Sequence, residues 1–349
     1  MGTFDMQTKF SRIYPFLFVS VFFLTLLIQL GVPNLTLETV SEEFLWKDSL
    51  IRNLNNVRRQ LGDRVFSEAI IGKEGWMFYT GDKSLEDYQR TLKIDPRGTR
   101  NALRDLALLD EIVNGYGGKL LLVVVPDKQT VYPQYMPDET PVLGELSRLD
   151  RVLNQARDLG LDVEIVDLRG VLIEASASRQ VYQKADTHWN CLGAYYGYRE
   201  VMERVAAAYP EAAPHPLSDF EIVPTDPIVR DIPRMLGFDH LEGGWDLIPR
   251  FIPNHLTITE EKLEKKQYFR RIVENERSDL PTALVFHDSF YDFCFNQFIE
   301  QHFSRTYAIH YGMVEDYSDL IEKERADVII IQTAERFLTR VLALIKRRG

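Results

Sequence analysis

The sequence predicts an α/β protein with a doubly wound, mainly parallel sheet, preceded by one N-terminal transmembrane helix. Short apolar runs typical of buried strands alternate along the chain with stretches that have helical spacing. The clearest run, residues 119–125, reads KLLLVVV and is closed by Pro126, as expected for a strand buried on both faces. The transmembrane helix is predicted from an uncharged run at residues 14–32.

This uncharged run, residues 14–32, is long enough to cross the ~30 Å core of a bilayer at about 1.5 Å per residue. Lys9 and Arg12 precede it, whereas acidic residues follow it. The positive-inside rule then places residues 1–13 in the cytoplasm and the rest of the chain outside, anchored by one span. We expect the anchor in the inner (cell) membrane and the domain in the periplasm or another extracytoplasmic space. A cleaved signal peptide is the alternative, but the run is long for one, and no small-x-small cleavage site follows it cleanly.

After the anchor, the sequence predicts a juxtamembrane stalk and one large domain. The stalk, residues 33–60, is polar and mixed in charge, with some helix expected. The domain covers residues 61–349. Within it, residues 210–280 are rich in proline and then in charge, and we interpret them as an insertion or lid packed on the sheet.

Three elements are predicted after the first strand. Residues 141–159 have helical spacing and end at Gly160, a good C-terminal cap. Residues 163–168 (VEIVDL) read as a second strand. A long helix is expected from Asn190, a competent N-cap, to near Tyr209.

The C-terminal half continues the alternation. Strands are predicted at 283–286, 306–311 and 328–331, with a helix at 292–303 between the first two. A final helix over 334–347 carries an apolar side. Sheets of this kind place their sites beyond the carboxyl ends of the strands.

Composition limits the function. With 349 residues, 45% of them hydrophobic, the chain can bury a large core. The formal net charge is −11 and no long basic run occurs, so we expect no nucleic-acid partner, and an anionic substrate needs a local basic patch. Two cysteines make no disulfide scaffold, and no pair has the spacing of a zinc site. We therefore predict neither a metal nor a cofactor.

A candidate nucleophile, Ser289, lies in the sequence FHDSF at residues 286–290, directly after the strand at 283–286. A serine at a strand-to-helix turn is exposed at the carboxyl edge of the sheet, and backbone N–H groups there can stabilise an oxyanion. The alternative is a serine that only caps the helix.

A candidate base lies in the sequence ADTHWN, residues 185–190. Asp186 can accept a hydrogen bond from one ring nitrogen of His188, which leaves the other nitrogen free to take a proton from a serine hydroxyl. The alternative is a core histidine beside an aspartate helix cap. A zinc site is a poorer interpretation, because one histidine and one aspartate make only two ligands.

Lys128 and Tyr132 are weaker candidates for substrate binding, since they follow the strand that ends at Pro126. Lys128 could hold an anionic sugar, and Tyr132 could hydrogen-bond an acyl oxygen. Equally, Lys128 could be solvated and Tyr132 a loop anchor.

An aromatic cluster follows the histidine. Trp189 and three tyrosines could stack on sugar rings, although aromatic residues at helical spacing more often belong to the core; the tyrosines are Tyr195, Tyr196 and Tyr198. Glu335 and Arg336, at the start of the last helix, form either an ion pair near the site or part of the surface.

Five segments, taken in their order along the chain, are together similar to the motifs of a known family. They are GKEGWMFY at 72–79, PDKQTVYP at 126–133, DTHWN at 186–190, RDIPRMLG at 230–237 and HDSF at 287–290. This set closely resembles the AlgJ/AlgX family of alginate O-acetyltransferase proteins, over most of the soluble part of the chain.

The resemblance implies an SGNH-hydrolase-like fold in which the Asp/His motif precedes the serine, the reverse of the order in ordinary SGNH hydrolases. Asp186 would then orient His188, His188 would act as general base, and Ser289 would carry the acyl group. The implied activity is O-acetylation of an exported cell-surface polysaccharide. The implied partners are that polysaccharide, a membrane-bound O-acyltransferase as the acetyl source, and other proteins of the export complex.

One residue departs from the family pattern. The usual glycine before Asp-Ser is His287 in this chain. A Cβ atom there could strain a tight turn or narrow the oxyanion hole, and the histidine could line the pocket or simply pack.

Two other functions remain open. An SGNH esterase or deacetylase would use the same triad with water as the acceptor. A non-catalytic scaffold of an export complex would keep the fold alone, although the presence of all three triad residues argues against it.

The two cysteines, Cys191 and Cys294, follow His188 and Ser289 closely. If His188 and Ser289 touch, the two segments that follow them start close together, and an oxidising compartment would permit a disulfide. The alternative is two small buried side chains in different parts of the core, because Cα atoms more than about 7 Å apart cannot be bridged.

Overall fold

The computed structural model describes residues 20, 47–250, 255–262 and 269–345. The chain divides into two units, residues 1–62 and residues 63–349. Each unit is described by itself.

In the first unit, the described regular element is the helix α3, Lys47–Gln60, which lies within the predicted stalk. The predicted span at 14–32 lies outside the described residues, apart from Ser20, and so do residues 1–13. The span therefore stays a prediction. Among the residues that the structure describes, none of the helices combines the length and the apolar character that a membrane crossing requires.

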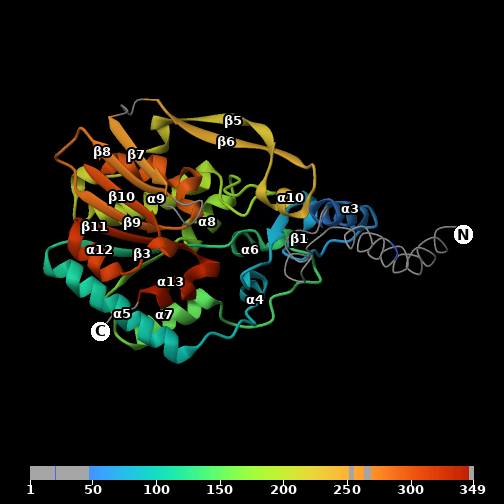
Figure 1. Ribbon diagram of the computed structural model, residues 1–349, viewed down its shortest axis with the longest axis horizontal. Helices are drawn as coiled ribbons and strands as arrows, with labels where there is room; N and C mark the ends of the chain where they lie inside the picture. The colour runs from blue at the N-terminus through green and yellow to red at the C-terminus, as the bar shows by residue number, and fades with distance from the viewer. Residues whose placement is uncertain (1–19, 21–46, 251–254, 263–268, 346–349) are drawn as a thin grey trace, which may run out of the picture. The chain divides into compact units, whose positions relative to one another are not determined.

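The second unit is built on a seven-stranded sheet (Figure 1). In spatial order its strands are β4 (Glu164–Asp167), β3 (Lys119–Val125), β11 (Val328–Ala334), β9 (Thr282–His287), β10 (Arg305–His310), β8 (Phe269–Asn275) and β7 (Leu256–Lys262). The first five run parallel, and β8 and β7 add to the edge in antiparallel pairing. The predicted mainly parallel sheet is confirmed.

Helices cover both faces of this sheet, as the two hydrophobic clusters of the core show. One cluster joins the sheet to α8 (Arg169–Ser176), α9 (Cys191–Ala206) and α11 (Asn296–Ile299). The other joins it to α5 (Pro96–Gly115), α7 (Arg148–Asp158), α12 (Tyr317–Glu324) and α13 (Leu338–Leu344). Strand β3 explains the arrangement, because Leu121 and Val123 belong to the first cluster and Leu122 and Val124 to the second. The sheet is therefore doubly wound.

The remaining elements lie around the carboxyl edge of the sheet or beside it. They are the strand pair β1 (Ala69–Ile71) and β2 (Met77–Tyr79), the short helices α4 (Ser84–Tyr88) and α6 (Lys128–Val131), and the antiparallel pair β5 (Phe220–Val229) and β6 (Leu241–Pro249) with α10 (Asp231–Leu236) between them.

The predicted insertion at 210–280 is only partly an insertion. Its first half forms the hairpin β5–β6, seen at the top of Figure 1. Its second half supplies β7 and β8, which extend the central sheet through pairing with β10. The prediction took the charged residues as a sign of an insertion, but strands at the edge of a sheet tolerate charged side chains on their exposed side.

The helix predicted over 141–159 begins later than expected. It is α7, which starts at Arg148 because Ser147 and Asp150 form a capping box. The Ser147 hydroxyl accepts the Asp150 N–H at 3.2 Å, and the Asp150 carboxylate accepts the Ser147 N–H at 2.9 Å. The predicted stop is confirmed, since Gly160 has a φ of +63°.

Two C-terminal helices also differ from the prediction. Residues 292–303 are not one helix: Tyr291–Phe295 forms an interrupted π-type turn, and the regular helix α11 follows it for four residues. The final helix, predicted over 334–347, starts later than expected. It is α13, Leu338–Leu344, and Ala334 still belongs to β11. The predicted helix cap at Asn190 is confirmed, with its side chain accepting the Gly193 N–H at 2.9 Å.

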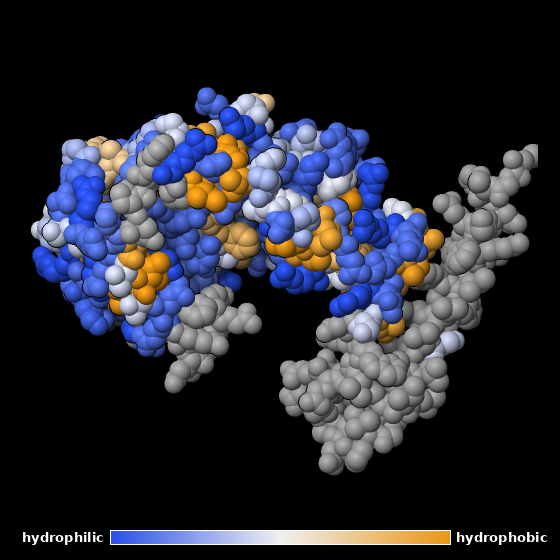
Figure 2. Space-filling view, turned by 90° about the horizontal axis from the view of Figure 1, so that it is seen from above, coloured by the Kyte–Doolittle hydropathy of each residue, from blue (hydrophilic) through white to orange (hydrophobic). Residues whose placement is uncertain are grey.

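Most large apolar side chains are buried, and a smaller number are exposed on the surface. Figure 2 shows one face, which is mainly hydrophilic with separate apolar patches. The largest aromatic side chains, Trp189 and Tyr198 among them, are fully buried, whereas Leu143 and Leu241 are examples of exposed apolar residues. The carboxyl ends of β3, β11 and β9 meet at one edge of the sheet, and polar segments follow all three.

Candidate active site

Three predicted residues meet at the carboxyl edge of the sheet. Asp186 and His188 lie in the loop before α9, and Ser289 follows β9. The Nδ1 atom of His188 is 2.7 Å from Oδ1 of Asp186, and Nε2 is 2.8 Å from Oγ of Ser289. A carboxylate only accepts, so Nδ1–H donates to Asp186, and the serine hydroxyl donates to Nε2. This is the arrangement that activates a serine as a nucleophile.

The electrostatics fit this arrangement. Burial raises the pKa of Asp186, but its hydrogen bond with His188 and the charge of that ring lower the pKa below the ordinary value. Asp186 is therefore an ionised acceptor at neutral pH. His188 is buried, whereas Ser289 is exposed, so a substrate can reach the nucleophile while the base stays shielded.

The nucleophile turn is fixed by Asp288. Its carboxylate accepts the Phe290 N–H at 3.0 Å, the Gln332 side-chain amide at 2.9 Å and the Ala334 N–H at 2.6 Å. The last two partners lie on β11, so the turn is tied to the neighbouring strand. The N–H of Ser289 has no protein acceptor among the described residues, which makes it the best candidate for an oxyanion donor.

His287 is packed inside the protein. Its side chain is buried, packs on Tyr291 with ring centroids 4.5 Å apart, and donates from Nδ1 to the Asp288 carbonyl at 3.0 Å. Burial lowers the pKa of His287 to about 4, so the ring is neutral. His287 is absent from the residues with positive φ, so this turn does not need the family's glycine. This placement agrees with the packing alternative, and the substrate-binding role of His287 stays a prediction.

A second carboxylate, Asp231, supports the histidine loop. It accepts the Thr187 N–H at 2.8 Å and also the Thr187 hydroxyl, and its Oδ2 atom is 3.7 Å from His188 Nδ1. Burial and the charge of Asp186 raise the pKa of Asp231. Asp231 begins α10 within the RDIPRMLG segment, so the fold places this segment directly behind the base.

Lys128 binds the loop that carries Asp186 and His188. Its ammonium group donates to the carbonyls of Gln183, Lys184 and Asp186 at 3.0, 2.8 and 2.6 Å. The side chain is buried, and burial lowers its pKa to about 8. Lys128 is therefore not solvated, so that interpretation is wrong, and its role as a ligand for an anionic sugar stays a prediction. Its position suits a structural clamp, because all three protons reach loop carbonyls.

Replacing Lys128 by methionine is expected to lower the free energy of unfolding by about 2–4 kcal/mol, because three buried carbonyls lose their donor. The matched control is Lys93→Met, at an exposed lysine in coil, which should change stability by less than about 0.5 kcal/mol. Thermal unfolding of both variants measures the difference. Equal midpoints for Lys128→Met and the parent protein would show that the clamp carries no stability.

Tyr132 and Trp189 are structural as well. The Tyr132 hydroxyl accepts the Val181 N–H at 2.8 Å, which confirms the loop-anchor alternative. Trp189 is buried, and its indole N–H donates to the carbonyls of Phe290 and Phe293 at 3.1 and 2.8 Å. Its indole joins the start of α9 to the segment after the nucleophile. The burial of Trp189 agrees with the core alternative, and its sugar-binding role stays a prediction.

Glu335 and Arg336 do not pair with each other. Arg336 donates to Asp127, and Glu335 accepts the Thr130 hydroxyl at 2.8 Å and the Asp127 N–H at 3.1 Å. Both side chains are buried, and burial together with the charges of Asp87 and Asp127 raises the pKa of Glu335 to about 8. They brace the loop after β3 against the end of β11.

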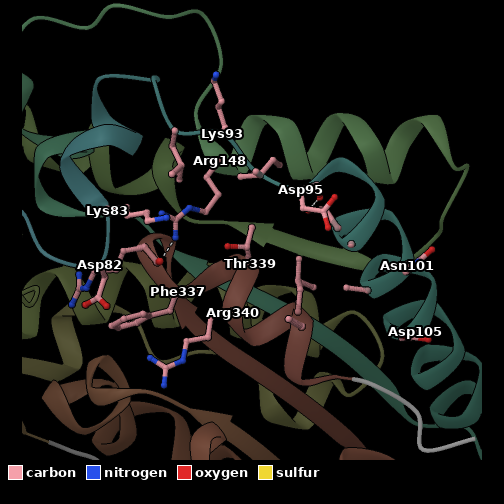
Figure 3. A pocket seen from close by; sticks show the side chains of 18 residues that line it. Asp82, Lys83, Lys93, Asp95, Asn101, Asp105, Arg148, Phe337, Thr339 and Arg340 are labelled. Atoms are coloured by element: carbon pink, nitrogen blue, oxygen red, sulfur yellow. Dashed lines mark hydrogen bonds between the residues drawn. The ribbon is translucent and has the colours of Figure 1, made fainter.

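A cavity of about 800 Å³ lies between α5 and α13. Figure 3 shows Lys83 from the turn before α4, Arg148 from the start of α7 and Arg340 from α13 around it. No triad residue is part of its lining. Arg336 lines the cavity and also lies 5.2 Å from the ring of Phe290, so this guanidinium separates the cavity from the nucleophile turn.

Two groups of described side chains have donor types that suit a metal. In the first, donor atoms of Asp186, His188 and Asp231 lie within 4.8 Å of one another. Its histidine nitrogen is already hydrogen-bonded to Asp186. The second contains Asp246 and the two cysteines, but the sulfurs are bonded to each other and are not thiolate ligands.

The cysteines form a disulfide, Cys191–Cys294, with Cα atoms 5.1 Å apart. The separation lies inside the limit for a bridge, so the alternative of two unrelated core positions is wrong. The disulfide links the first residue of α9 to the π-type turn after Ser289.

Sequence reasoning missed three supporting residues: Asp231, Asp288 as an anchor, and Phe293. Asp231 had a signal, since it lies in a segment that resembles a family motif. Asp288 also had one, as the residue before the nucleophile. Phe293 had none, because its position depends on the turn and disulfide that carry it.

Comparison with known families matches residues 69–279, more than half of the chain, to the model described as "SGNH hydrolase-like domain, acetyltransferase AlgX". The matched range contains Asp186 and His188 and ends before Ser289. Among curated proteins, a probable alginate O-acetylase AlgJ from Pseudomonas aeruginosa is 33% identical over 125 residues, which is 36% of this chain and 30% of that protein. A second, from Pseudomonas putida, is 27% identical over 43% of this chain and 38% of its own length. The chain thus spans only about a third of these relatives.

Solved structures show the same fold. A DHHW family protein from Eubacterium siraeum superposes with a TM-score of 0.60 at 16% identity, covering 81% of this chain and 96% of that chain. PatB1 from Bacillus cereus gives a TM-score of 0.55 at 14% identity, with 70% and 92% covered. At these identities the likeness establishes the fold alone.

Proposed function

The chain belongs to the family of SGNH hydrolase-like acetyltransferase domains of the AlgX type, and from this premise we propose that it O-acetylates an exported polysaccharide. The observation that carries the proposal is the continuous hydrogen-bonded series Asp186–His188–Ser289 beside an exposed serine hydroxyl. The curated relatives named as alginate O-acetylases support an acidic exported polymer as the acceptor.

The first half-reaction forms an acetyl-serine. Oγ of Ser289 attacks the carbonyl carbon of an acetyl donor while Nε2 of His188 takes the hydroxyl proton. Asp186 stabilises the imidazolium that results. The Ser289 N–H stabilises the oxyanion, and the leaving group departs with the proton from Nε2.

The second half-reaction returns the enzyme to its starting state. A sugar hydroxyl loses its proton to Nε2 of His188 and attacks the acetyl carbon. The bond between that carbon and Ser289 Oγ breaks, and Oγ recovers the proton from the imidazolium. Transfer exceeds hydrolysis where the acceptor sugar occupies the site and displaces water.

The cellular setting is part of the same proposal. Residues 14–32 would anchor the chain in the inner membrane, with the catalytic domain in the periplasm. A membrane-bound O-acyltransferase would supply the acetyl group, and other export proteins would present the polymer. The Cys191–Cys294 disulfide supports an oxidising compartment, because such bonds are rare in the cytosol.

The test is a transfer assay with the full chain, a small acetyl ester as donor and deacetylated alginate as acceptor. We expect O-acetyl groups on the polymer and little additional free acetate. Free acetate that is unchanged by the polymer would favour the esterase alternative. Neither product from a folded protein would favour the scaffold.

A further inference from the structure

We propose that Phe293 is a positioning residue for His188, and that the Cys191–Cys294 disulfide holds Phe293 in place. The inference rests on the proposed role of Ser289 as nucleophile. It goes beyond the triad, because it assigns the shielding and alignment of the base to an aromatic ring and a covalent bond outside the triad.

The ring of Phe293 lies flat on the imidazole. The two ring centroids are 4.0 Å apart, and the ring planes differ by 6°. Phe290 contacts the same imidazole at 4.9 Å with its plane tilted by 55°. Rotation of the imidazole out of its plane would collide with Phe293 and would break the contact between Nε2 and Ser289, so the stacked ring keeps the base in its productive orientation.

Phe293 also shields the base from solvent. The residue Phe293 is 37% exposed, whereas His188 beneath it is 8% exposed. An aromatic face can stabilise the imidazolium that forms when Ser289 is deprotonated, and it excludes water that would otherwise compete for Nε2.

The backbone that presents Phe293 is not one that a helix would adopt. Phe293 has φ −85° and ψ 84°, and Cys294 has a left-handed φ of +66°. A left-handed backbone is unfavourable for a residue with a side chain and persists only where surrounding contacts enforce it. A continuous helix from Phe290 to Ile299 would carry the Phe293 ring away from the imidazole.

Two contacts enforce this backbone. The Phe293 carbonyl accepts the Trp189 indole N–H at 2.8 Å. Cys294 is bonded to Cys191, 103 residues earlier and three residues after His188. Trp189 and Cys191 flank Asn190, directly after the base. The base and the ring that covers it are therefore held by the same short segment, and loss of the disulfide removes the covalent cross-link between the two segments.

The experiment measures how fast a sulfonyl fluoride modifies Ser289 in the full chain. In this reaction Oγ forms a bond to sulfur, fluoride leaves, and His188 takes the hydroxyl proton, so no acetyl donor or polymer is needed. We expect Phe293→Leu to slow the modification by about tenfold or more. Phe293→Tyr keeps the stacked ring and should restore most of the rate. The matched control is Tyr196→Leu, at an aromatic residue of α9 that contacts Tyr195 and not the histidine.

The disulfide is tested on the same reaction. Reduction of the parent protein and the double variant Cys191→Ala/Cys294→Ala should slow modification by a similar factor, and a reductant should have no further effect on the double variant. Circular dichroism and thermal unfolding confirm that each protein is folded. Modification of Phe293→Leu and of the reduced protein at the parent rate would overturn this inference alone. Absence of modification in the parent protein would overturn the nucleophile assignment as well.

Discussion

Replacing Ser289 by alanine is expected to lower acetyl transfer by about four orders of magnitude or more, because the residue that carries the acyl group is lost. The change should leave the fold intact, since Ser289 is exposed and, among the residues that the structure describes, its hydroxyl hydrogen-bonds to His188 Nε2 alone, at 2.8 Å. Initial rates with a small acetyl ester, with and without polymer, measure the effect.

Ser218→Ala is the matched control for this variant, because Ser218 is also exposed to solvent but lies before β5, outside the triad. It should retain the activity of the parent protein. Mass spectrometry of the parent protein after a brief reaction should find the acetyl group on the peptide that contains Ser289. If Ser289→Ala kept more than about a tenth of the parent rate, the nucleophile would have to be another residue.

The parallel part of the central sheet could be predicted because its inner strands β3, β9 and β11 are buried on both faces and read as continuous apolar runs. The predicted ranges 119–125, 163–168, 283–286, 306–311 and 328–331 overlap strands β3, β4, β9, β10 and β11, with residues 163, 168 and 311 just outside them. For such strands the apolar run and its bounds are visible without knowledge of the neighbours.

Other elements depend on partners that are distant in sequence. The irregular turn at Tyr291–Phe295 replaces a predicted helix because a disulfide and an indole hydrogen bond fix it from residues about a hundred positions earlier. The helix α5 is different, because its signals are local. Asp95 caps it by accepting the Arg97 N–H, and Pro96 stands at its first position, so sequence reasoning had the means to find it.

The candidate site divides in the same way. Asp186, His188 and Ser289 were predictable because an aspartate, a histidine and a serine are the residue types of a nucleophilic triad, and because their motifs resemble those of a family. Lys128 was placed wrongly, because a lysine is buried only where acceptors surround it, and its three carbonyls come from a loop 55 to 58 residues later. Its burial therefore followed from the tertiary structure alone.

The aspartate of the triad gives the last prediction. Asp186→Asn is expected to lower kcat/KM by up to about four orders of magnitude while the fold is kept. The Asp186 carboxylate accepts both Nδ1–H and the backbone N–H of His188, at 2.7 and 3.1 Å. An amide NH₂ group facing Nδ1 would donate instead of accept. The imidazole would then carry its proton on Nε2, where it can no longer take the proton of Ser289.

Asp231→Asn distinguishes orientation of the imidazole from the general presence of negative charge beside it. Asp231 lies 3.7 Å from Nδ1 but receives its hydrogen bonds from Thr187, so its amide variant should keep the tautomer and lose only about tenfold in kcat/KM. Both variants remove one negative charge close to the same ring, and a purely electrostatic role would make their losses similar. If Asp231→Asn were the more damaging change, Asp231 would be the residue that orients the base. Steady-state kinetics on the same acetyl ester, with thermal unfolding of each variant, decides between these outcomes.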